Sequence, residues 1–149
     1  MTVKQQVEAA IRDALKSGNQ QRLSALRMIK AELLLKEKET GKDLDDAGAD
    51  RALLSMLKKY RKARDEYESL GKSDEADRYE RDMKIIESFL TAPMMDDSRI
   101  KQELERLVAD LEATGPRDFG RVMKAFMSAH PNADGKVASS ILKEILNRE

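Results

Sequence analysis

Apolar residues recur every three or four positions along nearly the whole chain, and short segments with glycine or proline interrupt this pattern. The spacing places apolar side chains on one side of an α-helix, whereas a half-buried strand requires strict alternation. Residues that favour strands form no alternating runs. Hydrophobic residues make up 40% of the chain and charged residues 38%, a balance typical of helices that are apolar on one side only. The sequence therefore predicts an all-α protein.

Helix-ending signals divide the first part of the chain into four expected helices. Gly18, Gly41 and Gly71 each follow a periodic apolar stretch, and glycine readily adopts the left-handed backbone that often follows a helix. Pro93 is expected to end the fourth helix, because proline disfavours helical geometry in the residue before it. The four helices are expected at about residues 3–16, 20–40, 50–70 and 74–90, with Asn19 and Ser73 as candidate N-caps.

Three shorter helices are expected beyond a boundary at residues 91–97. Asp97 or Ser98 can cap the first of them, because both side chains accept hydrogen bonds from helix N-terminal amides. Pro116 suits the first turn of the second, and Asp134 is expected to cap the third. The sequence thus predicts an N-terminal four-helix unit and a smaller three-helix bundle, over residues 1–92 and 96–149 respectively.

Several classes of protein are disfavoured by composition. The absence of cysteine removes disulfides, thiolate nucleophiles and thiolate metal ligands, and a reducing cytoplasm is the expected location. Charged residues interrupt the N-terminus every few positions, so we expect neither a signal peptide nor a membrane span. The only histidine, His130, precedes a proline in an expected loop and is interpreted as a surface side chain. We therefore expect no catalytic residues, no metal site and no cofactor.

The last two expected helices have basic outer faces. At 100° per residue, Arg117, Arg121 and Lys124 lie opposite the apolar side of one helix. On the other helix, Lys136 and Lys143 are seven residues apart and are nearly in register. An array of this kind suits a phosphate backbone, because neutralised phosphates release counterions. The candidate RNA-binding residues are Arg117, Gly120, Arg121, Lys124, Gly135, Lys136, Ser140 and Lys143.

Structural explanations compete with this interpretation. Lysine and arginine are common on any solvated helix face, and spacing alone favours that explanation. For Gly120, close packing between helices is the preferred interpretation over close approach of a partner backbone. Gly135 could place its amide against a phosphate, but Asp134 is expected to occupy the amides of that helix N-terminus. A denser basic run at Lys58, Lys59, Arg61, Lys62 and Arg64 is a secondary candidate that Asp65, Glu66 and Glu68 are expected to neutralise.

Two segments of the C-terminal part resemble signatures of the GatB/YqeY family. DFGRVMKAFM, residues 118–127, is similar to that family's D-M-G-K-V-M pattern, and ADGKVASSILKEIL, residues 133–146, is similar to its A-D-G-K-x-V pattern. The resemblance continues through LSALRMIKAEL, residues 23–33, and extends over nearly the whole chain. Family members usually have Y-L-P-x-Q-L at the hinge between the two parts. This chain instead reads FLTAPMM, residues 89–95, with the proline displaced by two positions.

The resemblance implies a role in transfer RNA recognition. The related domain in the amidotransferase that amidates misacylated glutamyl- or aspartyl-tRNA is the C-terminal tail of its B subunit, which contacts tRNA. This implies that Gly120, Arg121, Lys124, Gly135 and Lys136 belong to a matching tRNA-binding module. The family label of carbon–nitrogen ligase with glutamine as amido-nitrogen donor would describe the complex, since this chain has no counterpart of the catalytic portions.

We therefore expect a tRNA-binding accessory protein whose partners are tRNA or another structured RNA and the tRNA amidation machinery. A rival hypothesis is a helical adaptor whose N-terminal helices bind a protein, with no role for RNA. A third is an enzyme that acts only within a complex. It ranks last because no nucleophile and base can be named.

Overall fold

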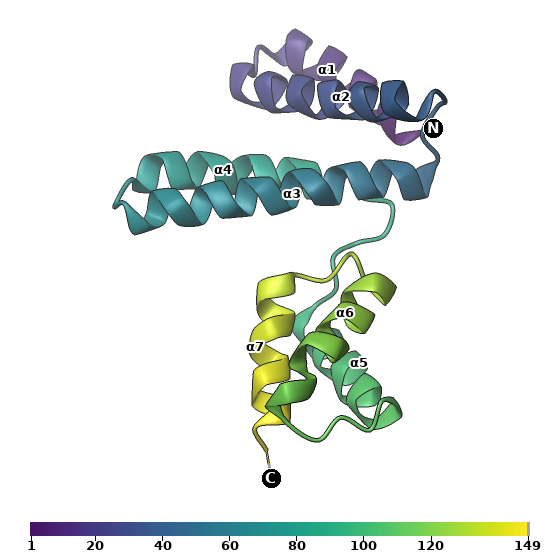
Figure 1. Cartoon of the computed structure of the whole chain (residues 1–149). Coiled ribbons are helices and arrows are strands. Elements are labelled where there is room, and N and C mark those ends of the chain that lie inside the picture. Colours follow the sequence, from purple (N-terminus) through teal and green to yellow (C-terminus); the bar gives the residue numbers. More distant parts are fainter. Residues whose placement is uncertain (149) are drawn as a thin grey trace. The chain divides into compact units, whose positions relative to one another are not determined.

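The computed structural model describes residues 1–148, and within that range it contains seven α-helices, one short 3₁₀-helix and no strand. The prediction of an all-α protein is therefore confirmed. The chain divides into two compact units, Met1–Ala92 and a second that begins at Pro93. Figure 1 shows the helices of each unit, coloured along the sequence. None of the helices in the described part of the chain is long and apolar enough to cross a membrane.

The first unit consists of two helical hairpins. Its helices are α1 (Val3–Ser17), α2 (Gln20–Thr40), α3 (Asp46–Ser69) and α4 (Ser73–Glu87). The helix pairs α1–α2 and α3–α4 pack closely, and α2 also contacts both α3 and α4 (Figure 1). The largest fully buried side chains of this unit are Val7, Leu26, Ile29, Leu33, Leu53, Leu57 and Ile86. Burial of these apolar surfaces is the main force that holds the hairpins together.

The glycine signals in this unit were interpreted correctly. Gly18, Gly41 and Gly71 have φ angles of 72°, 74° and 73°, in the left-handed region that favours glycine. The Asn19 side chain accepts a hydrogen bond from the Arg22 amide and caps α2, as predicted.

The start of α3 and both ends of α4 differ from the sequence-based expectation. Helix α3 begins four residues early because the carboxylate of Asp45 accepts a hydrogen bond of 2.7 Å from the Gly48 amide. Ser73 is the first residue of α4 rather than its cap, and the N-cap position makes no side-chain hydrogen bond. Helix α4 ends at Glu87, so Pro93 is not what terminates it.

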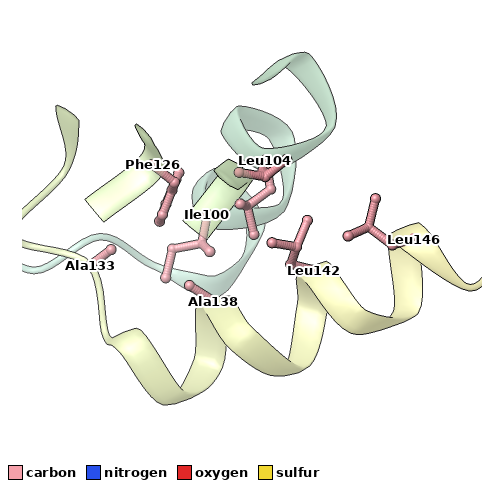
Figure 2. Packing of buried hydrophobic residues seen from close by; sticks show 8 residues of the cluster. Ile100, Leu104, Phe126, Ala133, Ala138, Leu142 and Leu146 are labelled. Carbon is pink, nitrogen blue, oxygen red and sulfur yellow. The ribbon is translucent and has the colours of Figure 1, made fainter. Parts of the chain in front are cut away.

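The second unit is a bundle of α5 (Asp97–Asp110), α6 (Phe119–Ala129) and α7 (Gly135–Leu146). The 3₁₀-helix η1 (Pro116–Asp118) leads into α6. All three helices contact one another, and Figure 2 shows side chains of α7 that point toward those of α5 and toward Phe126 of α6. The buried core consists of Ile100, Leu104, Val122, Phe126, Ala133, Ala138, Leu142 and Leu146.

Helix caps in the second unit agree with the sequence in one case and differ in another. Asp96 caps α5 by accepting a 2.8 Å hydrogen bond from the Arg99 amide, so the expectation of Asp97 or Ser98 was wrong by one or two positions. Asp134 caps α7 as predicted.

The segment between α4 and α5 is held separately by each unit. In the first unit, the Asp50 carboxylate accepts hydrogen bonds from the Thr91 amide at 2.8 Å and the Ala92 amide at 3.1 Å. In the second unit, the Asn132 side-chain amide donates to the Pro93 carbonyl at 2.8 Å, and the Met95 amide donates to the Asn132 carbonyl at 3.0 Å. The first set thus holds residues 91 and 92, and the second holds residues 93 and 95, so the division falls at the peptide bond between residues 92 and 93.

Candidate nucleic-acid interface

Two contacts show that α6 and α7 lie antiparallel. The Lys143 ammonium lies 5.8 Å from the centroid of the Phe119 ring, so the start of α6 meets the later turns of α7. At the opposite end, a Cβ added at Gly135 would lie 4.0 Å from the Met127 methyl carbon, so the end of α6 meets the start of α7. This register places Lys124 at the level of the middle turns of α7.

Most of the predicted binding residues are exposed on these two helices. Lys124 and Lys143 are exposed, and Lys143 makes a cation–π contact with Phe119. Lys124 has no ion-pair partner within residues 1–148. Arg117 is exposed on η1. We refer to Arg117, Gly120, Lys124, Gly135, Lys136, Ser140 and Lys143 as the α6/α7 surface.

Arg121 differs from the other predicted cations because it has a structural role. Its guanidinium donates to the Leu111 carbonyl at 3.1 Å and to the Asp118 carboxylate at 3.3 Å. Arg121 thus links the end of the α5 segment to the start of α6 through these two hydrogen bonds. The expectation that all three cations of this helix present their charges together was therefore wrong for Arg121. A carbonyl ten residues upstream fixes the guanidinium.

Asp118 is the acidic partner in this connection. A hydrogen bond of 2.9 Å from the Thr114 amide is the main cause that holds the pKa of the Asp118 carboxyl below its usual value, with a further contribution from Arg121. The carboxylate is therefore ionised at neutral pH, and it offsets the charge of Arg121 rather than that of Lys124. A carboxylate so close to the proposed interface lowers the positive potential at the η1 end.

The fold does not explain Gly120 as helix packing. Gly120 is exposed, and a Cβ built on it would have no atom within 4 Å. Its φ angle also lies outside the left-handed region. The preferred interpretation, a glycine required for close helix packing, was therefore wrong. The bare backbone at this position instead leaves room for another molecule to approach α6.

Replacing Gly120 with alanine is expected to stabilise the isolated protein by about 0.5–1 kcal/mol, because alanine loses less conformational entropy in a helix. The same change should weaken binding of any ligand whose backbone approaches α6 at this point. Measuring both the thermal unfolding and the RNA affinity of the Gly120→Ala variant separates the effect on stability from the effect on binding. An unchanged affinity together with the higher stability would show that no ligand backbone comes close to Gly120.

The N-terminus of α7 is occupied by its own cap. One carboxylate oxygen of Asp134 accepts from the Lys136 amide at 2.9 Å and from the Val137 amide at 3.4 Å. These amides are therefore not available to a phosphate, as the sequence led us to expect. Gly135 is partly buried and its Cβ position meets only the methyl group of Met127 at ordinary contact distance. Alanine would fit there as well.

His130 lies against the core rather than free on the surface. Its ring centroid is 5.0 Å from that of Phe126, and its Nε2 lies 3.7 Å from a carboxylate oxygen of Glu103. The side chain is 26% exposed, so His130 is a partly buried surface residue. Within residues 1–148 there is also no group of three histidine or acidic side chains that could hold a metal ion. The contact between Phe119 and Lys143 could not be anticipated from the sequence, because it depends on how α6 and α7 pack.

Comparison with known proteins identifies the family. No curated protein matches the chain. The family model described as Yqey-like protein matches residues 4–146, which is nearly the entire sequence. This match agrees with the signatures at residues 118–127 and 133–146, and with the helical fold that contains them. The chain therefore belongs to the YqeY-like protein family.

Proposed function

We propose that this protein is a cytoplasmic accessory factor that binds tRNA, or a related structured RNA, and serves glutamine-dependent amidation of misacylated tRNA. The observation that supports this proposal most directly is the α6/α7 surface, where Lys124 and Lys143 are exposed on adjacent antiparallel helices. A hydroxyl at Ser140 and open backbone at Gly120 lie on the same two helices. This combination suits a phosphate backbone, which needs cations, neutral donors and close approach.

The chemistry of amide transfer is assigned to a partner enzyme in this proposal. Within residues 1–148, the Ser140 hydroxyl makes no hydrogen bond to a histidine or a carboxylate that could act as its general base. The label of carbon–nitrogen ligase would then describe the assembly in which the protein acts. Recognition by the factor itself would depend on the shape and backbone of the RNA, because no aromatic side chain is exposed there to stack on bases.

The combined substitutions Lys124→Glu and Lys143→Glu test the proposal. Each change removes one cation and introduces an anion facing the phosphates, so the affinity for purified bulk tRNA at low salt should fall at least tenfold. Fluorescence anisotropy with labelled tRNA measures the change. Arg99→Glu with Arg106→Glu is the matched control, because both arginines are exposed seven residues apart on α5 of the same unit. Equal loss in the control, or unchanged binding by the first variant, would reject the proposed function.

The adaptor hypothesis is the second candidate because α2 has apolar side chains at its surface. Met28, Leu34 and Leu35 are 55%, 44% and 50% exposed, which is unusual for a helix that also contributes four large residues to the core. A purified protein without affinity for tRNA, together with a stoichiometric protein partner that survives nuclease treatment, would favour this second function over the first.

A further inference from the structure

The middle of α3 concentrates positive charge to a degree that the rest of the chain does not. Residues 51–64 contain six lysines and arginines and no aspartate or glutamate, although the chain as a whole has a formal net charge of zero. They are Arg51, Lys58, Lys59, Arg61, Lys62 and Arg64. This run belongs to the first unit, and the α6/α7 surface does not include it.

Four cations of this run are exposed, whereas Arg61 and Arg64 are partly buried. Arg51, Lys58 and Lys62 lie within about 40° of one another around the helix, opposite the buried Leu53 and Met56. Arg51, Lys58, Lys59 and Lys62 are all exposed. We refer to these four residues as the α3 basic face.

Acidic neighbours do not neutralise the lysines of the α3 basic face. Asp65, the nearest acid along the helix, is paired with Arg64 at 3.2 Å, and Arg64 is also paired with Glu80 of α4; these partners raise the pKa of its guanidinium. Within residues 1–148, neither Lys58 nor Lys59 nor Lys62 has an ion-pair partner. The expectation that Asp65, Glu66 and Glu68 would neutralise this run was therefore wrong for these three lysines.

The close spacing of these lysines destabilises α3 when no polyanion is bound. Lys58 and Lys62 are four residues apart, and Lys59 and Lys62 are three apart, so their like charges repel across one helical turn. A bound polyanion would remove that repulsion. The face also extends over about 16 Å from Arg51 to Lys62 at 1.5 Å per residue, which is long enough to follow several consecutive phosphates.

Nucleic acid suits this face better than an acidic protein does. Protein–protein interfaces are depleted in lysine and depend on aromatic or aliphatic anchors, whereas α3 has no exposed large apolar side chain. Lysines on flexible stems are well matched to phosphates, whose positions vary along the backbone.

We infer that the α3 basic face is a second RNA-contacting surface, which binds the phosphate backbone independently of the α6/α7 surface. The inference rests on the proposed function in supposing that RNA is the physiological polyanion. It extends that function by assigning RNA contacts to the first unit as well as to the second.

The test uses the full chain with Lys58→Glu and Lys62→Glu combined. Affinity for bulk tRNA at low salt should fall at least tenfold, and the slope of log K against log salt should become shallower by about two. Lys58→Arg with Lys62→Arg should bind like the wild type, because the charge is kept. Arg12→Glu with Lys16→Glu is the matched control, since these cations are also exposed four residues apart on a helix of the first unit.

The outcomes separate this inference from the proposed function. Wild-type affinity in the α3 variant, with loss in the Lys124→Glu and Lys143→Glu variant, would overturn the inference and leave the proposed function standing. Loss only in the α3 variant would support the inference and reject the α6/α7 surface. An equal loss in the Arg12→Glu and Lys16→Glu control would overturn the inference, because the effect would then reflect total charge. A thermal midpoint at or above the wild-type value shows that the α3 variant is folded.

Discussion

Replacing Phe126 with alanine is expected to remove most or all of the stability of the second unit. The Phe126 side chain is fully buried among Ile100, Leu104 and Leu142, and a phenylalanine-to-alanine change in such a core costs about 3–5 kcal/mol. A unit of this size has only about 3–9 kcal/mol available, at roughly 0.05–0.15 kcal/mol per residue. Hydrogen exchange should then show loss of protection in α5, α6 and α7, while α1 to α4 keep theirs.

Met127→Ala is the matched control for this prediction. Met127 is the neighbouring residue of the same helix, but it is only partly buried and packs at the edge of the core. Its truncation should lower the unfolding free energy less than the Phe126 change and leave α5, α6 and α7 protected at room temperature. Comparable exchange rates for the Phe126 variant and the wild type would mean that the core in Figure 2 is not what holds the unit together.

Binding to tRNA is expected to depend steeply on salt. If the four cations of the α6/α7 surface each neutralise a phosphate, the slope of log K against log salt is about −3 to −4. Affinity should then fall about 100-fold between 50 and 200 mM salt. With the four cations of the α3 basic face also engaged, the slope should steepen to about −6 to −7 and the fall should be on the order of 10³- to 10⁴-fold. Titrations of labelled tRNA at four or five salt concentrations give the slope directly.

The matched comparison is duplex DNA of similar length under the same conditions. A protein that reads the folded shape of tRNA should bind it more tightly than the duplex at every salt concentration, since both ligands share the phosphate term. A tRNA affinity that changes less than threefold over the whole salt range would be incompatible with the electrostatic basis of both proposed surfaces.

Helix ends were predictable where one residue type has a unique conformational role. Gly18, Gly41 and Gly71 adopt positive φ angles that residues with side chains rarely adopt, so their positions alone located three helix termini. The starts of α3 and α5 were less predictable because several acids precede each helix. Asp45 and Asp50 are equally able to cap α3 in isolation, and the contact of Asp50 with residues 91–92 only exists once the chain has folded.

The candidate site was predictable to the level of helix faces but not of individual side chains. Helical spacing put Lys124 and Lys143 on outer faces correctly. The direction of Arg121 depends on the Leu111 carbonyl, and the open space around Gly120 depends on where α7 packs. Both are properties of the tertiary structure. The exposure of Leu15 and Leu34 has the same origin, because a periodic stripe does not reveal how far its neighbouring helix extends.

The hydrogen bonds of Asp50 and Asn132 define the boundary between the two units at the peptide bond between residues 92 and 93. Each unit holds its own side of this junction through hydrogen bonds within itself. A gene fusion made at this bond would consequently leave these hydrogen bonds in place in either unit. A module bounded in this way is well suited to reuse beside other domains.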